Sequence, residues 1–123
     1  MSRTEPLKFY GYKGCDSCRK AKKYLIAKEI EFEEIAIREH PPTLPELRSM
    51  LGSYKGDLRR LFNASGQEYR KGKWKEKLPA MGEEEALLSL SENGHLVKRP
   101  FLVGKGVALV GFKETEWSEQ FGG

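Results

Sequence analysis

The chain has 123 residues, of which 38% are hydrophobic and 33% charged, and its aromatic residues are six Phe, five Tyr and two Trp. A chain of this length and composition can bury its own core, so we expect one folded domain over residues 1–123 and exclude a disordered chain. The net charge of +4 favours encounters with anions, but acidic runs interrupt the basic residues, which argues against a dedicated nucleic-acid-binding domain.

The first part of the chain predicts a strand, a helix and a second strand. Residues 7–12 read as a strand that ends at a Lys13-Gly14 turn. Over residues 16–28, Cys18, Ala21 and Leu25 recur at helical spacing opposite a basic face. Period-two alternation then predicts a strand over residues 32–37. A crossover of this length makes the two strands parallel neighbours.

Residues 43–92 predict a helical insert. Thr43 is an expected N-cap, and Glu46 completes a capping box for a helix that runs to about residue 50. A short helix is expected over residues 55–62. Residues 63–77 are charged and broken by glycines, so we expect surface helix turns and loop there and no core element. Residues 83–90 predict a further helix with acidic residues in its first turn.

The last part of the chain predicts two strands and a helix. Residues 100–103 and 107–111 are short apolar runs around Gly104-Lys105-Gly106, a strong hairpin signal. A closing helix over residues 114–121 is expected to pack Trp117 and Phe121. The order β-α-β, helical insert, β-β-α is that of an α/β, thioredoxin-like fold with a mixed four-stranded sheet.

The cysteine usage points to reactive thiols. The first twenty residues hold no apolar run of signal-peptide length, and no stretch is long enough to span a membrane, so we expect a cytoplasmic protein without membrane partners. In a reducing compartment two cysteines are seldom a structural cross-link, and a disulfide between Cys15 and Cys18 would constrain the unfolded chain very little. The pair is therefore reactive or metal-binding.

Cys15 and Cys18 lie where a predicted strand passes into a helix. Cys15 is then beside the free N–H groups and the positive end of the helix dipole, which favours its thiolate. Lys13 and Arg19 add cations on either side, and we expect both to contact the substrate. Cys15 is the expected nucleophile, and Cys18, one turn further on, is the expected resolving cysteine that attacks a mixed disulfide at Cys15 and releases the partner.

Three other interpretations of these residues remain open. A zinc site needs about four ligands, but only His40 and His95 are left, without ligand-like spacing, and we expect both in exposed loops and no metal. The cysteines could instead be inert core residues. The basic run over residues 70–77 could contact nucleic acid, although Trp74 alone offers little stacking.

Two motifs resemble the arsenate reductase/Spx family, often called the ArsC/Spx family. The segment YKGCDSCRKA (residues 12–21) resembles its active-site turn, and VKRPF (residues 97–101) resembles its arginine and cis-proline element. The segments LFNASG (residues 61–66) and VGFK (residues 110–113) resemble an uncharacterised, reductase-like branch of that family. The resemblance covers nearly the whole chain.

The resemblance implies a thioredoxin fold, a nucleophilic Cys15 and a substrate or oxyanion pocket completed by Arg99. It also implies a cis bond between Arg99 and Pro100, with Pro100 facing the substrate across from Cys15. Asn63 and Gly111 stand at about the positions where glutathione-coupled arsenate reductases carry arginines. We therefore expect Asn63 to line the substrate pocket and arsenate to be a poor substrate.

Two functions follow from the resemblance. The first, which we prefer, is a thiol-dependent reductase of a disulfide or glutathione adduct, with no bound cofactor and with glutathione, glutaredoxin or another thiol as donor. The second is an Spx-like regulator that binds RNA polymerase and uses the cysteine pair as a redox switch. Gly56 could match the polymerase-contact glycine of that group.

Overall fold

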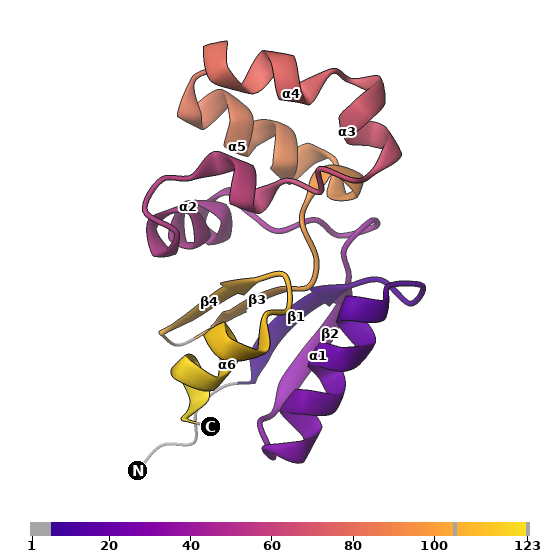
Figure 1. The fold of residues 1–123 in the computed structure, drawn as a ribbon, viewed down its shortest axis with the longest axis vertical. Coiled ribbons are helices and arrows are strands. Elements are labelled where there is room, and N and C mark those ends of the chain that lie inside the picture. Colours follow the sequence, from indigo (N-terminus) through magenta and orange to yellow (C-terminus); the bar gives the residue numbers. More distant parts are fainter. Residues whose placement is uncertain (1–5, 105, 123) are drawn as a thin grey trace.

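The computed structural model describes residues 6–104 and 106–122, and a four-stranded sheet lies at its centre (Figure 1). The strands run in the order β2-β1-β3-β4 and comprise β1 (Leu7–Gly11), β2 (Phe32–Ala36), β3 (Phe101–Gly104) and β4 (Val107–Val110). β1 and β2 are parallel, as predicted, whereas β3 is antiparallel to both β1 and β4. This order and the mixed sheet confirm the thioredoxin-like α/β fold.

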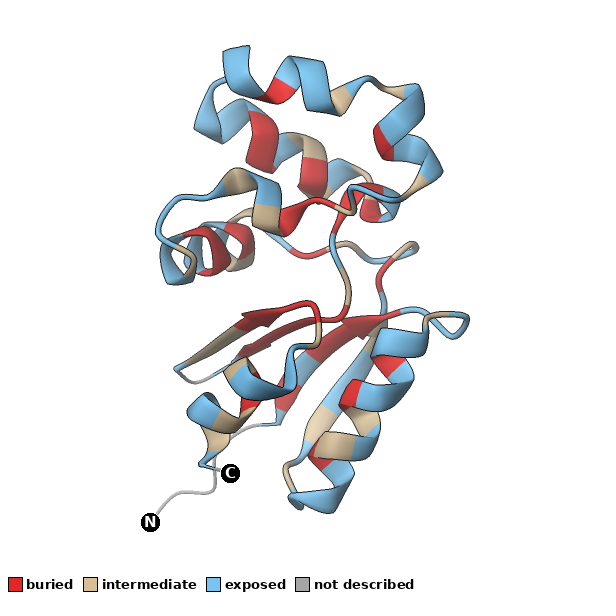
Figure 2. Ribbon diagram, viewed as in Figure 1, coloured by how far each residue is buried: buried red, intermediate tan, exposed pale blue. Residues whose placement is uncertain are grey.

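Helices cover both faces of the sheet. Helices α1 (Asp16–Ala27) and α6 (Glu114–Phe121) pack on one face, and the helical segment between β2 and β3 packs on the other (Figure 1). Neighbouring residues of a strand belong to different layers: Phe9 packs with α1 and α6, whereas Tyr10 packs with the helical segment. Figure 2 shows the resulting buried residues in the strands and on the sides of the helices that face inward.

Helix α1 buries the stripe that its spacing predicted, namely Cys18, Ala21 and Leu25. On the same side of the sheet, α6 buries Trp117 completely. The Trp117 ring packs edge-on against Tyr24 of α1, with 6.0 Å between ring centroids. The closing helix is therefore fixed against the helix that carries the cysteines.

The helical segment contains α2 (Leu44–Ser53), α3 (Gln67–Lys71), α4 (Trp74–Lys77) and α5 (Glu83–Glu92), with single 3-10 turns at Leu58–Leu61, Leu78–Ala80 and Gly94–Leu96. Helix α2 begins with the predicted capping box, in which the Thr43 hydroxyl accepts from the Glu46 backbone N–H and the Glu46 carboxylate accepts from the Thr43 N–H. It runs to Ser53 rather than to residue 50, because Leu51 is buried and the last turn stays packed on the sheet.

Two expectations for this segment need correction. The helix expected over residues 55–62 is only a 3-10 turn, because Lys55 and Gly56 adopt positive φ angles of 59° and 84° and redirect the chain after α2. The charged stretch over residues 63–77 forms two short helices, and it contributes to the core after all. Tyr69 is buried, and the Trp74 ring packs against Phe62 with 5.4 Å between ring centroids. In the predicted hairpin, Lys105 lies outside the described residues, while Gly104 pairs with Val107.

Candidate active site

The turn between β1 and α1 places the Cys15 sulfur at the start of a helix. Cys15 is the N-cap of α1, and its Sγ accepts a hydrogen bond of 3.3 Å from the backbone N–H of Cys18. The Cys15 N–H in turn donates to the Tyr12 carbonyl at 3.1 Å, which closes the turn. The sulfur therefore occupies the place of a capping oxygen, next to the free N–H groups and the positive end of the helix dipole.

Cys18 lies in the first turn of α1 and is only 2% exposed. Its sulfur packs on Gly11, where an added Cβ would approach Sγ to 3.3 Å and the Phe9 ring to 2.7 Å. Burial raises the pKa of Cys18 to about 12; a hydrogen bond to Cys15 also raises this pKa, whereas the Tyr12 backbone and the charge of Arg99 lower it. Cys18 is therefore a protonated thiol at neutral pH, and both cysteines are free.

Of the two cations expected on either side of Cys15, Arg19 has another partner. Its guanidinium forms an ion pair with the carboxylate of Asp16 in the first turn of α1, and both side chains are exposed. Lys13 is exposed on the turn that precedes Cys15. The charge of Arg19 is therefore largely matched by Asp16, and Lys13 is the more available of the two.

The predicted arginine–proline element reaches the cysteine turn from a distant part of the sequence. The Arg99–Pro100 peptide bond is cis, as predicted, and Pro100 is buried immediately before β3. The guanidinium of Arg99 lies over the Tyr12 ring, with Cζ 5.4 Å from its centroid. Because the Arg99 charge also lowers the pKa of Cys18, the structure brings Arg99 into the electrostatic environment of the cysteine pair.

Asn63 and Gly111, the two positions singled out for arsenate, have other contacts. Asn63 donates its backbone N–H to the Leu96 carbonyl at 2.7 Å, and its side chain accepts from Ser65. Gly111 has a φ of 71°, a value that favours glycine, and an added Cβ would approach the Cε of Lys98 to 3.1 Å. The Lys98 side chain therefore lies next to Gly111. The hydrogen bonds of Asn63 are made within the helical segment between β2 and β3.

Arg38 was not among the residues predicted from the sequence. Its Cζ lies 3.5 Å from the centroid of the Tyr12 ring, closer than that of Arg99. With Tyr12 and Lys13, Arg38 lines a cavity of about 420 Å³ at the ends of β1 and β2. Its position, just after the second of two parallel strands, is the signal that could have identified it, because the carboxyl ends of such strands meet at one edge of the sheet.

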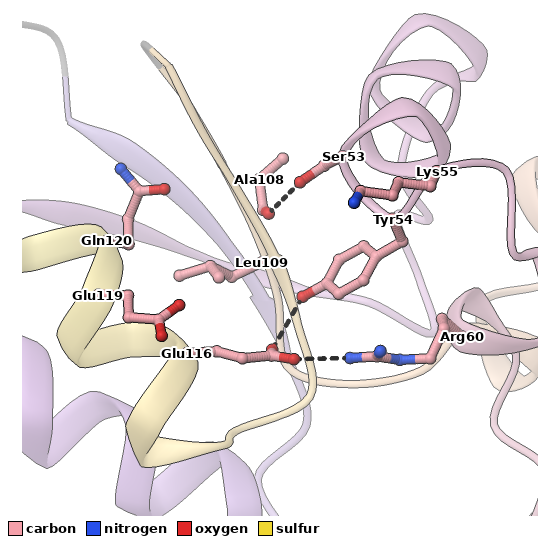
Figure 3. Close-up of a pocket in the computed structure, with 9 residues that line it drawn as sticks. All are labelled: Ser53, Tyr54, Lys55, Arg60, Ala108, Leu109, Glu116, Glu119 and Gln120. Atoms are coloured by element: carbon pink, nitrogen blue, oxygen red, sulfur yellow. Dashed lines mark hydrogen bonds and ion pairs between the residues drawn. The ribbon is translucent and has the colours of Figure 1, made fainter.

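A second cavity, of about 610 Å³, lies beside β4, the outer strand of the sheet (Figure 3). There the Tyr54 hydroxyl accepts from the Val110 N–H at 3.1 Å, and the Ser53 hydroxyl donates to the Ala108 carbonyl at 3.1 Å. These side chains satisfy backbone groups along the outer side of β4, which would otherwise be an open strand edge. Its lining residues come from the end of α2 and the chain just after it, from β4 and from α6, and not from the Tyr12-Lys13 turn that leads to Cys15, which lines the first cavity.

Other expectations concern histidines, metals and membranes. His40 and His95 are both exposed, as predicted. Across residues 6–104 and 106–122, no three His, Cys, Asp or Glu side chains form a group that could hold a metal ion. In the same residues, no helix combines the length and the apolar character needed to cross a membrane.

Comparison with known proteins assigns the chain to a family. The ArsC family model matches residues 10–120, which include both cysteines and the cis-proline element. The uncharacterised protein YusI of Bacillus subtilis is 43% identical over 94% of this chain and 98% of its own length, and the regulatory protein MgsR of the same organism is 30% identical over 91% and 87%. The crystal structure of an ArsC-family-related protein from Bacteroides fragilis superposes with a TM-score of 0.87 at 39% identity, covering 97% of this chain and 99% of the other. The chain belongs to the ArsC family.

Proposed function

We propose that this protein is a thiol-dependent reductase in which Cys15 is the nucleophile and Cys18 the resolving cysteine. The observation that carries the proposal is the position of the Cys15 sulfur, which caps α1 and accepts the Cys18 N–H at 3.3 Å. A sulfur in this position faces the N–H groups of a helix start, where a nucleophilic cysteine that attacks disulfides is commonly found. The burial of Cys18 and its raised pKa support the assignment of different roles to the two cysteines.

The reaction proceeds in two exchanges. The Cys15 thiolate attacks one sulfur of the substrate disulfide, a new S–S bond forms at Cys15, and the other substrate thiol leaves as a thiolate that takes up a proton. Cys18 then loses its proton and attacks the Cys15 sulfur, so that the bound substrate half leaves as a second thiol. The two cysteines are oxidised to a disulfide and the substrate is reduced by two electrons.

The cycle is completed by an external thiol. Two equivalents of a small thiol such as glutathione, or one reduced glutaredoxin, return the Cys15–Cys18 disulfide to the dithiol and are themselves oxidised to a disulfide. This chemistry requires no resident cofactor or metal. The expected compartment is the reducing cytoplasm, where such donors keep protein thiols reduced.

A second candidate function is a redox-switched regulator that binds RNA polymerase. Its support is the likeness to the regulatory protein MgsR, which extends over 91% of this chain. The Lys55-Gly56-Asp57 turn is also exposed, and positive φ angles at Lys55 and Gly56 make it project after α2. In this alternative the cysteine pair switches between dithiol and disulfide, and the partner is a polymerase subunit rather than a substrate.

Trapping of mixed disulfides distinguishes the reductase from the regulator. The Cys18→Ser variant lacks the resolving thiol and should accumulate mixed disulfides at Cys15, whereas the matched Cys15→Ser variant should accumulate none. Substrate proteins or a small thiol released from the trapped species by reduction would support the reductase. Non-covalent capture of polymerase subunits by both variants, without mixed disulfides, would support the regulator. Equal trapping by the two variants would contradict the assignment of Cys15 as nucleophile.

A further inference from the structure

Two arginines from distant parts of the chain share one aromatic ring beside the cysteines. The guanidinium carbons of Arg38 and Arg99 lie 3.5 Å and 5.4 Å from the centroid of the Tyr12 ring. The same ring packs on the turn before Cys15, because a Cβ added at Gly14 would approach it to 2.9 Å. Tyr12 thus links both guanidiniums to the segment that presents the nucleophilic sulfur.

The two guanidiniums form a cationic site, and neither is in an ion pair with a carboxylate among the described residues. Each has a buried nitrogen, Nε of Arg38 and Nη1 of Arg99, without a hydrogen-bond partner in that part of the chain. The cations lie closer together than the screening length of about 10 Å at 0.1 M salt, so they repel each other. The unpaired nitrogens and the repulsion both destabilise the site without a ligand, and an anion bound to the guanidiniums would offset these costs.

The neighbouring cavity defines the kind of ligand. Its volume of about 420 Å³ suits a small molecule, and it lies at the carboxyl ends of the parallel strands β1 and β2. Lys13 contributes a further cation to its wall. Of the two carboxylates on the wall, Glu34 is already paired with Lys22 at 2.9 Å, and Glu39 is exposed.

We propose that Arg38, stacked on Tyr12 and acting with Arg99, is a specificity-determining residue that binds the carboxylate of a small thiol while its sulfur is joined to Cys15. This inference rests on the proposed reductase function. It names the substrate class as disulfides of carboxylate-bearing thiols, in preference to neutral or cationic ones. Arg38 contacts the carboxylate of the substrate and not the two sulfurs that exchange.

The test compares three small disulfides that differ in charge. Formation of the mixed disulfide at Cys15 is followed by mass spectrometry in the Cys18→Ser background, with anionic dithiodipropionate, neutral hydroxyethyl disulfide and cationic cystamine. One charge-assisted contact predicts a preference of about tenfold for the anionic over the neutral disulfide. Arg38→Gln should reduce this ratio to near one, and Arg38→Lys should restore part of it.

Matched controls separate this effect from general charge and from folding. Lys23→Gln removes one exposed positive charge from α1 and should leave the ratio unchanged. Tyr12→Leu removes the stacking platform and should reduce the ratio as Arg38→Gln does. An unchanged ratio in a folded Arg38→Gln variant would overturn the inference and leave the reductase proposal intact. Absence of reaction with all three disulfides would overturn the reductase proposal itself.

Discussion

The hydroxyl of Tyr54, just after α2, donates a hydrogen bond of 3.2 Å to the carboxylate of Glu116 in α6. The other oxygen of that carboxylate accepts from Arg60 at 2.9 Å, and the guanidinium of Arg60 lies over the Tyr54 ring (Figure 3). Since the same hydroxyl accepts the Val110 N–H, one side chain joins the helical layer, the edge strand β4 and α6. These hydrogen bonds connect the helices on one face of the sheet to α6 on the other face.

Replacing Tyr54 by Phe should remove the hydrogen bonds of its hydroxyl and destabilise the folded protein. Tyr54→Phe leaves the Val110 N–H without its acceptor and removes one donor from Glu116, so the free energy of unfolding should fall by about 1–2 kcal/mol. Urea denaturation measures the change. Ser53→Ala, which removes an exposed hydroxyl from the same strand edge, is the matched control and should cost less. Equal effects of the two substitutions would contradict the role given to Tyr54.

The two cysteines should differ sharply in reactivity. With neutral iodoacetamide at pH 7, the reduced protein should be alkylated first at Cys15, because Cys18 is 2% exposed and its pKa is raised to about 12 by burial. In Cys15→Ser, modification of Cys18 should be slow and should still accelerate as the pH rises past about 10, since only the thiolate reacts. Peptide mapping gives the order, and faster labelling of Cys18 in the reduced wild-type protein would reverse the assigned roles.

Arg99 should influence the reactivity of Cys15. Arg99→Ala removes a cation that lies over the Tyr12 ring, beside the turn before Cys15, and that lowers the pKa of Cys18, so we expect alkylation of Cys15 by iodoacetamide to slow by about tenfold. Arg99→Lys should slow it less, because lysine keeps the charge without the planar fork. The side chain is half-buried, and thermal melting should show that both variants fold. Wild-type reactivity in Arg99→Ala would remove Arg99 from the site.

Arsenate should be turned over poorly. Asn63 and Gly111 stand where the family resemblance places two oxyanion-binding arginines, and neither residue carries a positive charge. Asn63 is bound to Leu96 and Ser65, and Gly111 has a φ of 71°, which an arginine would adopt only with strain. We therefore expect arsenate reduction, coupled to glutathione or glutaredoxin, well below about 1 s⁻¹ under conditions where small disulfides are reduced. Turnover at or above that rate would show that other cations, such as Lys98, supply the missing contacts.

Stability should decrease in mild acid through Glu46. Burial alone would raise the pKa of Glu46, but hydrogen bonds from Thr43, Tyr10 and Lys8 lower this pKa below its ordinary value. A lowered carboxyl pKa stabilises the fold above the unfolded-state value of about 4.3, and this contribution is lost as the pH falls through the folded-state value. The free energy of unfolding should therefore decline below about pH 5, and less steeply in Glu46→Gln. If the free energy of unfolding fell equally with pH in the wild type and in Glu46→Gln, Glu46 would not be the group responsible.

Local signals in the sequence were sufficient for the strands, for most of the helices and for the position of the two cysteines. The capping box at Thr43, the buried stripe of α1 and the strand–turn–helix setting of Cys15 each depend on residues within a few positions of one another. Such features form from hydrogen bonds and periodicity inside one segment, so spacing alone predicts them. The cis bond before Pro100 was also predicted, but from the likeness to a family and not from spacing.

The sequence by itself determined the order of the elements, the mixed sheet and the place of the two thiols at a helix start. Only the tertiary structure decided which distant side chains meet them: Arg38 and Arg99 over Tyr12, Lys98 over Gly111, and Tyr54 on the edge of β4. These contacts join positions far apart in the chain and depend on how the sheet and helices pack. No periodicity within one segment encodes them, because the side chains are brought together only when the layers close on one another.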